Sequence, residues 1–304
     1  MSETVAIITR TKNRPRLLVR CIRSVLDQTF RDWLHVIVND GGDAKEVDNI
    51  VCQFAAEYDG RFKIVHHERS RGMEAASNSG LRVIATEYVA FLDDDDTWHP
   101  DFLANMISTL IDTPSVQVKS AICQTEIVCE KMSGNDIIEL GREPLNPSFV
   151  CLRLDDLVIE NQFTNNAIVF HRSVLDEVGH FNERLDVLGD WDFNLRLHLR
   201  YDAVVLNNVL ARWHRRIPSG ERHYENSIHV AGERHKMARV QIINDAIRGK
   251  WLNGRPELLL ILVLGRKLEE LRAILERDRI PHSSVWHLIY ADIRKGIASI
   301  LGRR

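Results

Sequence analysis

The chain has 304 residues, of which 44% are hydrophobic and 27% are charged, values typical of a soluble globular protein with a large core. Its formal net charge of −3 argues against a general nucleic-acid-binding surface. The five cysteines show no CxxC spacing, which favours buried thiols in a reducing cytoplasm over a zinc site or a disulfide framework. The chain passes from Met1 directly into an apolar strand, and its longest apolar run is Leu258–Leu264. We therefore expect a cytoplasmic protein without a signal peptide or a membrane span.

The first hundred residues alternate short apolar strands with amphipathic helices. We expect helices to begin near Pro15, near Asp43, where Glu46 completes a capping box, and near Gly72. The strands are expected at residues 5–8, 35–38, 62–65 and 88–92. Alternation with such short connections predicts a parallel sheet with crossover helices.

Four consecutive aspartates, Asp93 to Asp96, follow the strand at 88–92. Open α/β sheets bind their ligands at the carboxyl ends of strands. Adjacent carboxylates repel one another unless a cation lies among them, and Mg²⁺ or Mn²⁺ binds carboxylate oxygens while sharing its other positions with substrate phosphates. The alternative is a solvated turn in which Asp96 or Asp101 caps the next helix. The buried strand before the aspartates favours the metal.

The pattern is looser beyond Pro100. We expect a helix over 102–110, one or two strands within 116–130, a turn at 133–136, a strand at 166–170 and a short helix that Ser173 caps and Gly179 ends. A helix starts at Asp190, two short strands cover 203–206 and 209–213, and residues 214–223 form a basic, mobile loop. Helices near 229–248, 256–277 and 283–301 follow. We therefore divide the chain into a domain at 1–228 and a helical C-terminal extension at 229–304.

Five segments occur in an order that resembles a known family: residues 5–11, residues 24–30 with Gln28-Thr29-Phe30, Val38-Asn39-Asp40-Gly41, residues 91–96 and Asp190-Trp191-Asp192. Together, over roughly residues 4–215, they resemble the family 2 glycosyltransferases, which are inverting enzymes of the GT-A fold. The resemblance implies an α/β, Rossmann-like, mostly parallel sheet flanked by helices, followed here by the helical extension.

The resemblance also implies a site for a nucleotide diphosphate sugar. Asn39 stands where the family usually has the first of two acids, and its amide can both donate and accept a hydrogen bond. A metal, Mn²⁺ or Mg²⁺, would neutralise the charge that grows on the leaving diphosphate. The resemblance assigns the nucleotide sugar to Thr9, Arg10, Thr11, Asn39, Asp40, Arg71, Asp93, Asp94 and His214, and the metal to Asp95 and Asp93.

The catalytic base of the family lies in a Glu-Asp pair at the start of a later helix. Here the pair reads Gly189-Asp190, so Asp190 matches the base that takes a proton from the acceptor hydroxyl. The alternative is that Asp190 only caps its helix. Asp192 points elsewhere on that helix and is expected to be structural.

We therefore expect a metal-dependent inverting glycosyltransferase that moves a sugar from a UDP- or dTDP-sugar, less favourably a GDP-sugar, to a hydroxyl of a glycan or a lipid-linked acceptor. The family points to glycan assembly at a bacterial cell surface. A non-catalytic nucleotide-sugar or glycan-binding module with the same fold is the alternative that Gly189 suggests. A nucleotidyltransferase would need a glycine-rich phosphate loop after the first strand, and residues 9–13 are not one.

The C-terminal extension carries an apolar stripe that runs from Leu258–Leu264 to Leu275. Packing against the catalytic domain or against a second copy of the chain is the favoured role. Peripheral contact with the inner membrane face is the alternative, since Arg294, Lys295 and Arg303 lie near the end.

Overall fold

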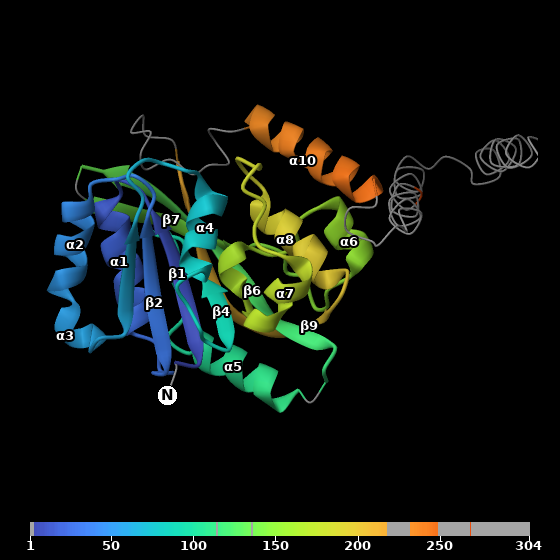
Figure 1. The fold of residues 1–304 in the computed structure, drawn as a ribbon, viewed down its shortest axis with the longest axis horizontal. Helices are drawn as coiled ribbons and strands as arrows, with labels where there is room; N and C mark the ends of the chain where they lie inside the picture. The colour runs from blue at the N-terminus through green and yellow to red at the C-terminus, as the bar shows by residue number, and fades with distance from the viewer. Residues whose placement is uncertain (1–2, 114, 135, 218–231, 249–267, 269–304) are drawn as a thin grey trace, which may run out of the picture.

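The computed structural model describes residues 3–113, 115–134, 136–217, 232–248 and 268 (Figure 1). The strands are β1 (Val5–Thr11), β2 (Trp33–Asn39), β3 (Phe62–His66), β4 (Tyr88–Phe91), β5 (Thr97–Trp98), β6 (Val118–Ser133), β7 (Asp136–Pro144), β8 (Ile168–His171) and β9 (Asp202–Arg216). The helices are α1 (Pro15–Leu26), α2 (Ala44–Gln53), α3 (Ala55–Tyr58), α4 (Met73–Leu81), α5 (Phe102–Asp112), α6 (Leu154–Ile159), α7 (Leu175–Val178), α8 (Gly189–His198) and α10 (Gly232–Ile247). The helices predicted at 256–277 and 283–301 lie outside the described residues, and the boundary at 228/229 stays a prediction.

The N-terminal half is the predicted parallel sheet. β1 lies between β2 and β4 and is parallel to both, and β3 pairs with the outer edge of β2. α1 and α2 cover one face of this half and α4 covers the other (Figure 1). Both faces are covered, so β1 and β2 are buried almost throughout, and β1 begins with the apolar run Val5–Ile8. In register, Thr11 lies opposite Asn39 and Ile8 opposite Phe91, so the carboxyl ends of β1, β2 and β4 meet at one edge.

The second half of the sheet is mixed, and with the parallel half it forms the mostly parallel sheet that the sequence predicted. β8 is antiparallel to both β4 and β6, β9 is parallel to β6, and β5 is antiparallel to β9. The two short strands predicted at 203–206 and 209–213 are one long strand, β9, with irregular register against β6. The mobile loop predicted from His214 was wrong for residues 214–216, because they pair with Val128–Glu130 of β6.

Several local predictions are settled by side-chain contacts. Asp43 caps α2 by accepting from the backbone N–H groups of Lys45 and Glu46. Ser173 does not cap a helix. The side chain of His171 instead caps the 3-10 turn Arg172–Val174 before α7, by accepting from the Ser173 N–H. All five cysteines are free, but Cys52 and Cys151 are exposed, so the expectation of buried thiols was wrong for these two.

The described part of the C-terminal extension, α10, packs on the domain. Ala238, Ile242 and Ala246 are buried, and Arg239 donates to the carbonyl of Ile159 while lying over the ring of Trp191. α10 crosses above α6 and α8 in Figure 1. Among the described residues, no helix is long and apolar enough to cross a membrane.

Candidate active site

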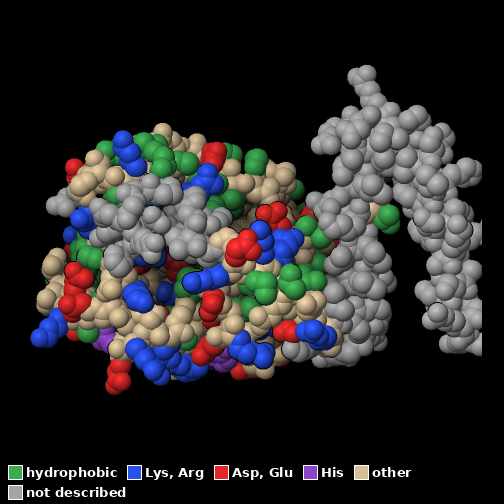
Figure 2. Space-filling model, turned by 90° about the horizontal axis from the view of Figure 1, so that it is seen from above, with side chains coloured by type: hydrophobic (Ala, Val, Ile, Leu, Met, Phe, Trp, Pro, Cys, Tyr) green, Lys and Arg blue, Asp and Glu red, His purple; other side chains and the backbone are tan. Residues whose placement is uncertain are grey.

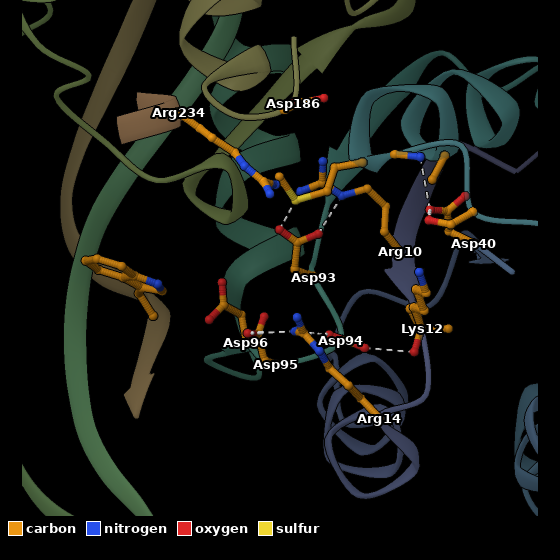
Figure 3. Close-up of a pocket in the computed structure, with 16 residues that line it drawn as sticks. Arg10, Lys12, Arg14, Asp40, Asp93, Asp94, Asp95, Asp96, Asp186 and Arg234 are labelled. Carbon is orange, nitrogen blue, oxygen red and sulfur yellow. Dashed lines mark hydrogen bonds and ion pairs between the residues drawn. The ribbon is translucent and has the colours of Figure 1, made fainter. Parts of the chain in front are cut away.

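A cavity of about 380 Å³ lies at the carboxyl ends of β1, β2 and β4, where the sequence predicted a ligand (Figure 3). Six of the predicted donor-site or metal-site residues line it: Arg10, Thr11, Asp40, Asp93, Asp94 and Asp95. Acidic and basic side chains also lie close together on the face seen in Figure 2. The cavity has further charged lining residues that the sequence analysis did not assign: Lys12, Arg14, Asp96, Asp186 and Arg234.

Three of the four aspartates after β4, Asp93 to Asp95, are paired with arginines. The Nε and Nη2 of Arg10 donate to the two oxygens of Asp93 over 2.7 and 2.6 Å, a bidentate pair. Asp94 accepts from the hydroxyl of Thr11 over 2.7 Å and from Arg14 over 3.1 Å. The sequence predicted a divalent cation among these acids, which stays a prediction; the arginines that the protein itself supplies were overlooked.

Asp95 is paired with two arginines. Its Oδ2 accepts from Arg14 over 3.1 Å and from Arg216 of β9. Burial alone would raise the pKa of Asp95, but the two guanidinium groups outweigh it and lower the pKa to about 2. Asp95 is therefore an anion at any physiological pH.

The cavity offers few carboxylate oxygens for the predicted metal. In the described part of the chain, no group of three or more His, Cys, Asp or Glu side chains converges as a metal cage. Mg²⁺ sites on phosphate substrates need only one or two carboxylates, because the phosphates complete the coordination. Arg10 occupies both oxygens of Asp93, whereas both arginines on Asp95 contact its Oδ2 alone. The residues fit this sparse type of site, with Asp95 as the better ligand.

His214 lies behind the cavity in a buried network. Its Nε2 contacts the hydroxyl of Thr97 at 2.8 Å and its Nδ1 contacts Glu130 at 2.9 Å. Glu130 also accepts from Arg20 over 2.8 Å and from Arg216 over 3.3 Å. The network thus supports the arginine that binds Asp95, and the imidazole predicted to reach the diphosphate is not among the cavity-lining side chains.

We expect Glu130→Gln to destabilise the fold by about 3 kcal/mol, because it leaves buried cations without their anion. Burial alone would raise the pKa of Glu130, but hydrogen bonds from His214 and Arg20 outweigh it and lower the pKa to about 2. The stabilisation is therefore present at neutral pH and is lost as the pH falls from about 4.5, the ordinary value, to about 2. Urea unfolding measures the effect.

Glu126→Gln is the control for this prediction. Glu126 lies on the same strand with 26% of its side chain exposed, and it pairs with Arg142. Its replacement should cost about 1 kcal/mol or less, as for other exposed pairs. Equal unfolding midpoints for Glu130→Gln and the wild type would show that the network does not stabilise the fold.

Asp40 holds the loop before α4, which lines the cavity with Ser70 and Gly72. Its carboxylate accepts from the Ser70 hydroxyl over 2.6 Å and from the backbone N–H groups of Arg71 and Gly72 over 2.8 and 3.1 Å. These bonds lower the pKa of Asp40 against the effect of burial. Gly41, at φ 76°, makes the close approach possible, because a Cβ there would lie 2.3 Å from the nitrogen of Ser70.

Three of the other predicted donor-site residues lie outside the cavity lining. The Asn39 side chain closes the turn to Gly42 by accepting from its N–H and donating to its carbonyl. Thr9 is fully buried and donates to the carbonyl of Leu92. Arg71 is half-exposed, and its guanidinium lies 3.7 Å from Glu183. Their assignment to the nucleotide stays a prediction.

Asp190 stands at the start of α8, as predicted. Leu188 precedes the helix in the left-handed conformation, at φ 62°, a strained geometry that is common at functional sites. The carboxylate is partly buried and accepts from the amide of Asn161 over 2.9 Å. Burial raises the pKa of Asp190, and its charge interacts with those of Arg10 and Asp93. The predicted base therefore lies beside the cluster of acids and arginines.

Asp192 has the structural role that the sequence suggested. It is buried and pairs with Arg196, one turn further along α8, over 2.8 Å. Arg196 also donates to the backbone carbonyls of Val178 and His180. The two aspartates of the Asp190-Trp191-Asp192 segment thus have different surroundings.

The family model described as Glycosyl transferase family 2 matches residues 6–179. The chain belongs to this family. The match covers β1 to α7, with the Asp93–Asp96 cluster, and ends before Asp190. The protein is therefore a glycosyltransferase, an enzyme that uses a nucleotide sugar as its donor.

Curated relatives agree with the family. The putative colanic acid biosynthesis glycosyl transferase WcaA of Escherichia coli is 26% identical over 200 residues, which cover 65% of this chain and 67% of that protein. The PGL/p-HBAD biosynthesis glycosyltransferase of Mycobacterium bovis is 28% identical over 63% of this chain and 68% of its own length. An uncharacterized Sinorhizobium fredii protein, y4gI, is 30% identical over 60% of this chain, but the match spans only 19% of that protein.

Solved structures share the fold. S. aureus TarS 1-349 superposes with a TM-score of 0.63 at 16% identity, covering 95% of this chain and 78% of TarS 1-349. The mannosyltransferase PcManGT of Pyrobaculum calidifontis, solved with GDP-Man and Mn²⁺, gives a TM-score of 0.61 at 19% identity over 98% of this chain and 81% of its own. These likenesses confirm the GT-A architecture.

Proposed function

We propose that this glycosyltransferase is a metal-dependent inverting enzyme that moves a sugar from a UDP- or dTDP-sugar to a hydroxyl of a glycan or a lipid-linked acceptor. The observation that carries the proposal is the convergence of strand-end acids and arginines in one cavity with Asp190 beside it. The names of the E. coli and Mycobacterium relatives, both in glycan or glycolipid biosynthesis, support the acceptor class.

In this proposal the cavity holds the diphosphate of the donor. Lys12 and Arg234 line it, and Arg234 points into it from α10 (Figure 3). Guanidinium and ammonium groups bind phosphate oxygens well. Asp95, with Asp93 beside it, would hold Mn²⁺ or Mg²⁺, which when bound supplies positive charge to the leaving diphosphate. The Mn²⁺ present in the PcManGT structure supports this choice of metal.

Asp190 acts as the base that accepts the proton of the attacking hydroxyl. An inverting displacement places the acceptor on the face of the sugar opposite the diphosphate, so the base must lie beside the phosphate site and outside it. In support of this role, Asp190 does not line the cavity, and its charge interacts with those of Arg10 and Asp93, which do. Asn161 orients it by donating to Oδ2.

The raised pKa of Asp190 predicts a pH dependence. Because burial raises this pKa, the base is protonated and inactive at pH values where an ordinary aspartate is already ionised. The rate should therefore rise with pH along an acid limb that lies above the ordinary aspartate range. A pH profile of kcat/KM measures it, and a rate that stays level down to the ordinary aspartate pKa would contradict the assignment.

The test of the proposed function is the release of free nucleotide from a panel of UDP-, dTDP- and GDP-sugars, with Mn²⁺ and with a chelator. We expect release from at least one donor, in the presence of metal, that a glycan or lipid-linked acceptor accelerates. Binding of nucleotide sugars without any turnover would instead support the non-catalytic module. Equal release with the chelator would contradict the metal dependence.

A further inference from the structure

Glu74, in the first turn of α4, is a buried glutamate that the sequence analysis did not single out. It is 3% exposed, and its carboxyl group packs directly against Gly189 of α8. A Cβ at position 189 would lie 2.1 Å from the Cδ of Glu74 and 2.3 Å from its Oε1. The carboxyl group of Glu74 thus occupies the space that any side chain at residue 189 would need.

The surroundings of this carboxyl group are unusual for a purely structural residue. Its Oε2 has no hydrogen-bond partner in the described part of the chain and lies 4.0 Å from Nη1 of Arg10. Burial, which Arg10 opposes, raises the pKa of Glu74 to about 8. An unsatisfied buried carboxyl group lowers stability, so its presence beside a functional site suggests a role in the reaction.

Glu74 lies between the two parts of the proposed machinery. On one side Arg10, whose Nη1 also contacts the Ser77 hydroxyl at 3.3 Å, holds Asp93 in a bidentate pair. On the other side the first turn of α8 carries Asp190, whose negative charge helps to raise the pKa of Glu74. The Glu74 carboxyl group is therefore placed to set the spacing between the Arg10 guanidinium and the start of α8.

We propose that Glu74 is a positioning residue for sugar transfer, and that Gly189 provides the space it needs. The carboxyl group that the family resemblance places on residue 189 is supplied here from α4, so the glycine does not indicate a decayed site. The inference rests on the proposed role of Asp190 as the base. It extends that role by naming the group that fixes the base relative to Arg10.

Single variants test the role of the carboxyl group. We expect Glu74→Met, which keeps the volume, to lower kcat for nucleotide release at least about tenfold. Affinity for UDP with Mn²⁺ should stay within about threefold, because Arg10 keeps its pair with Asp93. The melting temperature should be unchanged or higher, because the unsatisfied group is removed. Glu74→Gln, which keeps a neutral hydrogen-bonding group, should retain kcat within about threefold.

Two double variants distinguish the effect of the carboxyl group from the effect of the volume it fills. Glu74→Ala/Gly189→Glu moves the carboxyl group from α4 to α8, and Glu74→Ala/Gly189→Met fills the same space without it. We expect the first to recover kcat to within about tenfold of the wild type and the second to stay as low as Glu74→Ala.

Three results would overturn the inference. A stable Glu74→Met variant with the kcat of the wild type would show that the carboxyl group is not needed. Equal rescue by Gly189→Met and Gly189→Glu would show that only volume matters. If the wild type binds UDP with Mn²⁺ but releases nucleotide from no donor, the proposed function itself fails, and the positioning role fails with it.

Discussion

Asp190→Asn should lower kcat about 10³-fold while nucleotide binding persists, because a positioned general base contributes about 10²–10⁴-fold to such a reaction. The asparagine carbonyl can still accept from Asn161, as Oδ2 of Asp190 does over 2.9 Å, so the helix start is preserved. The amide cannot take the proton of the acceptor hydroxyl. Nucleotide release with and without acceptor, together with calorimetric binding of UDP and Mn²⁺, measures the two effects separately.

Asp192→Asn is the matched control on the same helix. Its carboxylate pairs with Arg196 over 2.8 Å and is buried, so its loss should destabilise the fold by about 3 kcal/mol. The kcat of the folded fraction should stay within a few-fold of the wild type. The assignment of the base would be wrong if Asp190→Asn kept more than about a tenth of the wild-type kcat, or if both variants lost activity equally.

The second large effect is expected at Asp95. Asp95→Asn removes the anion that Arg14 and Arg216 share through Oδ2 and the carboxylate best placed to bind a metal. We expect kcat/KM to fall about 10²-fold or more, and the Mn²⁺ concentration needed for half-maximal rate to rise strongly. Titrating nucleotide release against Mn²⁺ for the wild type and the variant gives both quantities.

Asp101→Asn provides the comparison for Asp95. Asp101 follows the same loop, but its side chain is 49% exposed and its only described hydrogen-bond donor among side chains is Thr29. Its loss should leave the Mn²⁺ dependence unchanged. A wild-type Mn²⁺ response in Asp95→Asn would remove Asp95 from the metal site and leave the arginines as its only partners.

The parallel half of the sheet and its ligand edge were predictable, because their signals are local. Each strand at 5–8, 35–38, 62–65 and 88–92 is an apolar run bounded by polar turns, and the crossover helices carry regular apolar stripes. Parallel strands with short connections place their carboxyl ends at one edge. This rule alone predicts that Asp40 and the Asp93–Asp96 cluster lie at one edge of the sheet. In the structure they line one cavity.

The antiparallel half was less predictable, because its pairings join distant segments. Arg216 was assigned to a loop from its basic neighbours, yet it lies at the end of β9 with 2% exposure and binds Asp95. The pairing of β9 with β6, which no local pattern encodes, places it there. The excess of carboxylates did indicate that cations must be near, and three basic residues, Arg10, Lys12 and Arg14, lie at or just after the end of β1.

Glu74 shows the same limit at the level of single residues. In sequence it is an acidic residue in the first turn of a helix, where acids are common because they favour the helix dipole. Glu74 is buried beside Arg10 because α4 packs against α8, where Gly189 leaves space for the Glu74 carboxyl group. The glycine at 189 was noticed as a missing acid, but a sequence cannot tell which other element fills the gap.

In the proposed function, the acids after β4 bind a nucleoside diphosphate through a divalent cation. Calorimetric titration of UDP and of GDP into the full chain, with Mn²⁺, with Mg²⁺ and with a chelator, tests it most directly. We predict saturable binding of a nucleoside diphosphate that requires the metal and weakens sharply in Asp95→Asn. Binding of equal strength in the chelator, or no binding of either nucleotide with Mn²⁺, would contradict it.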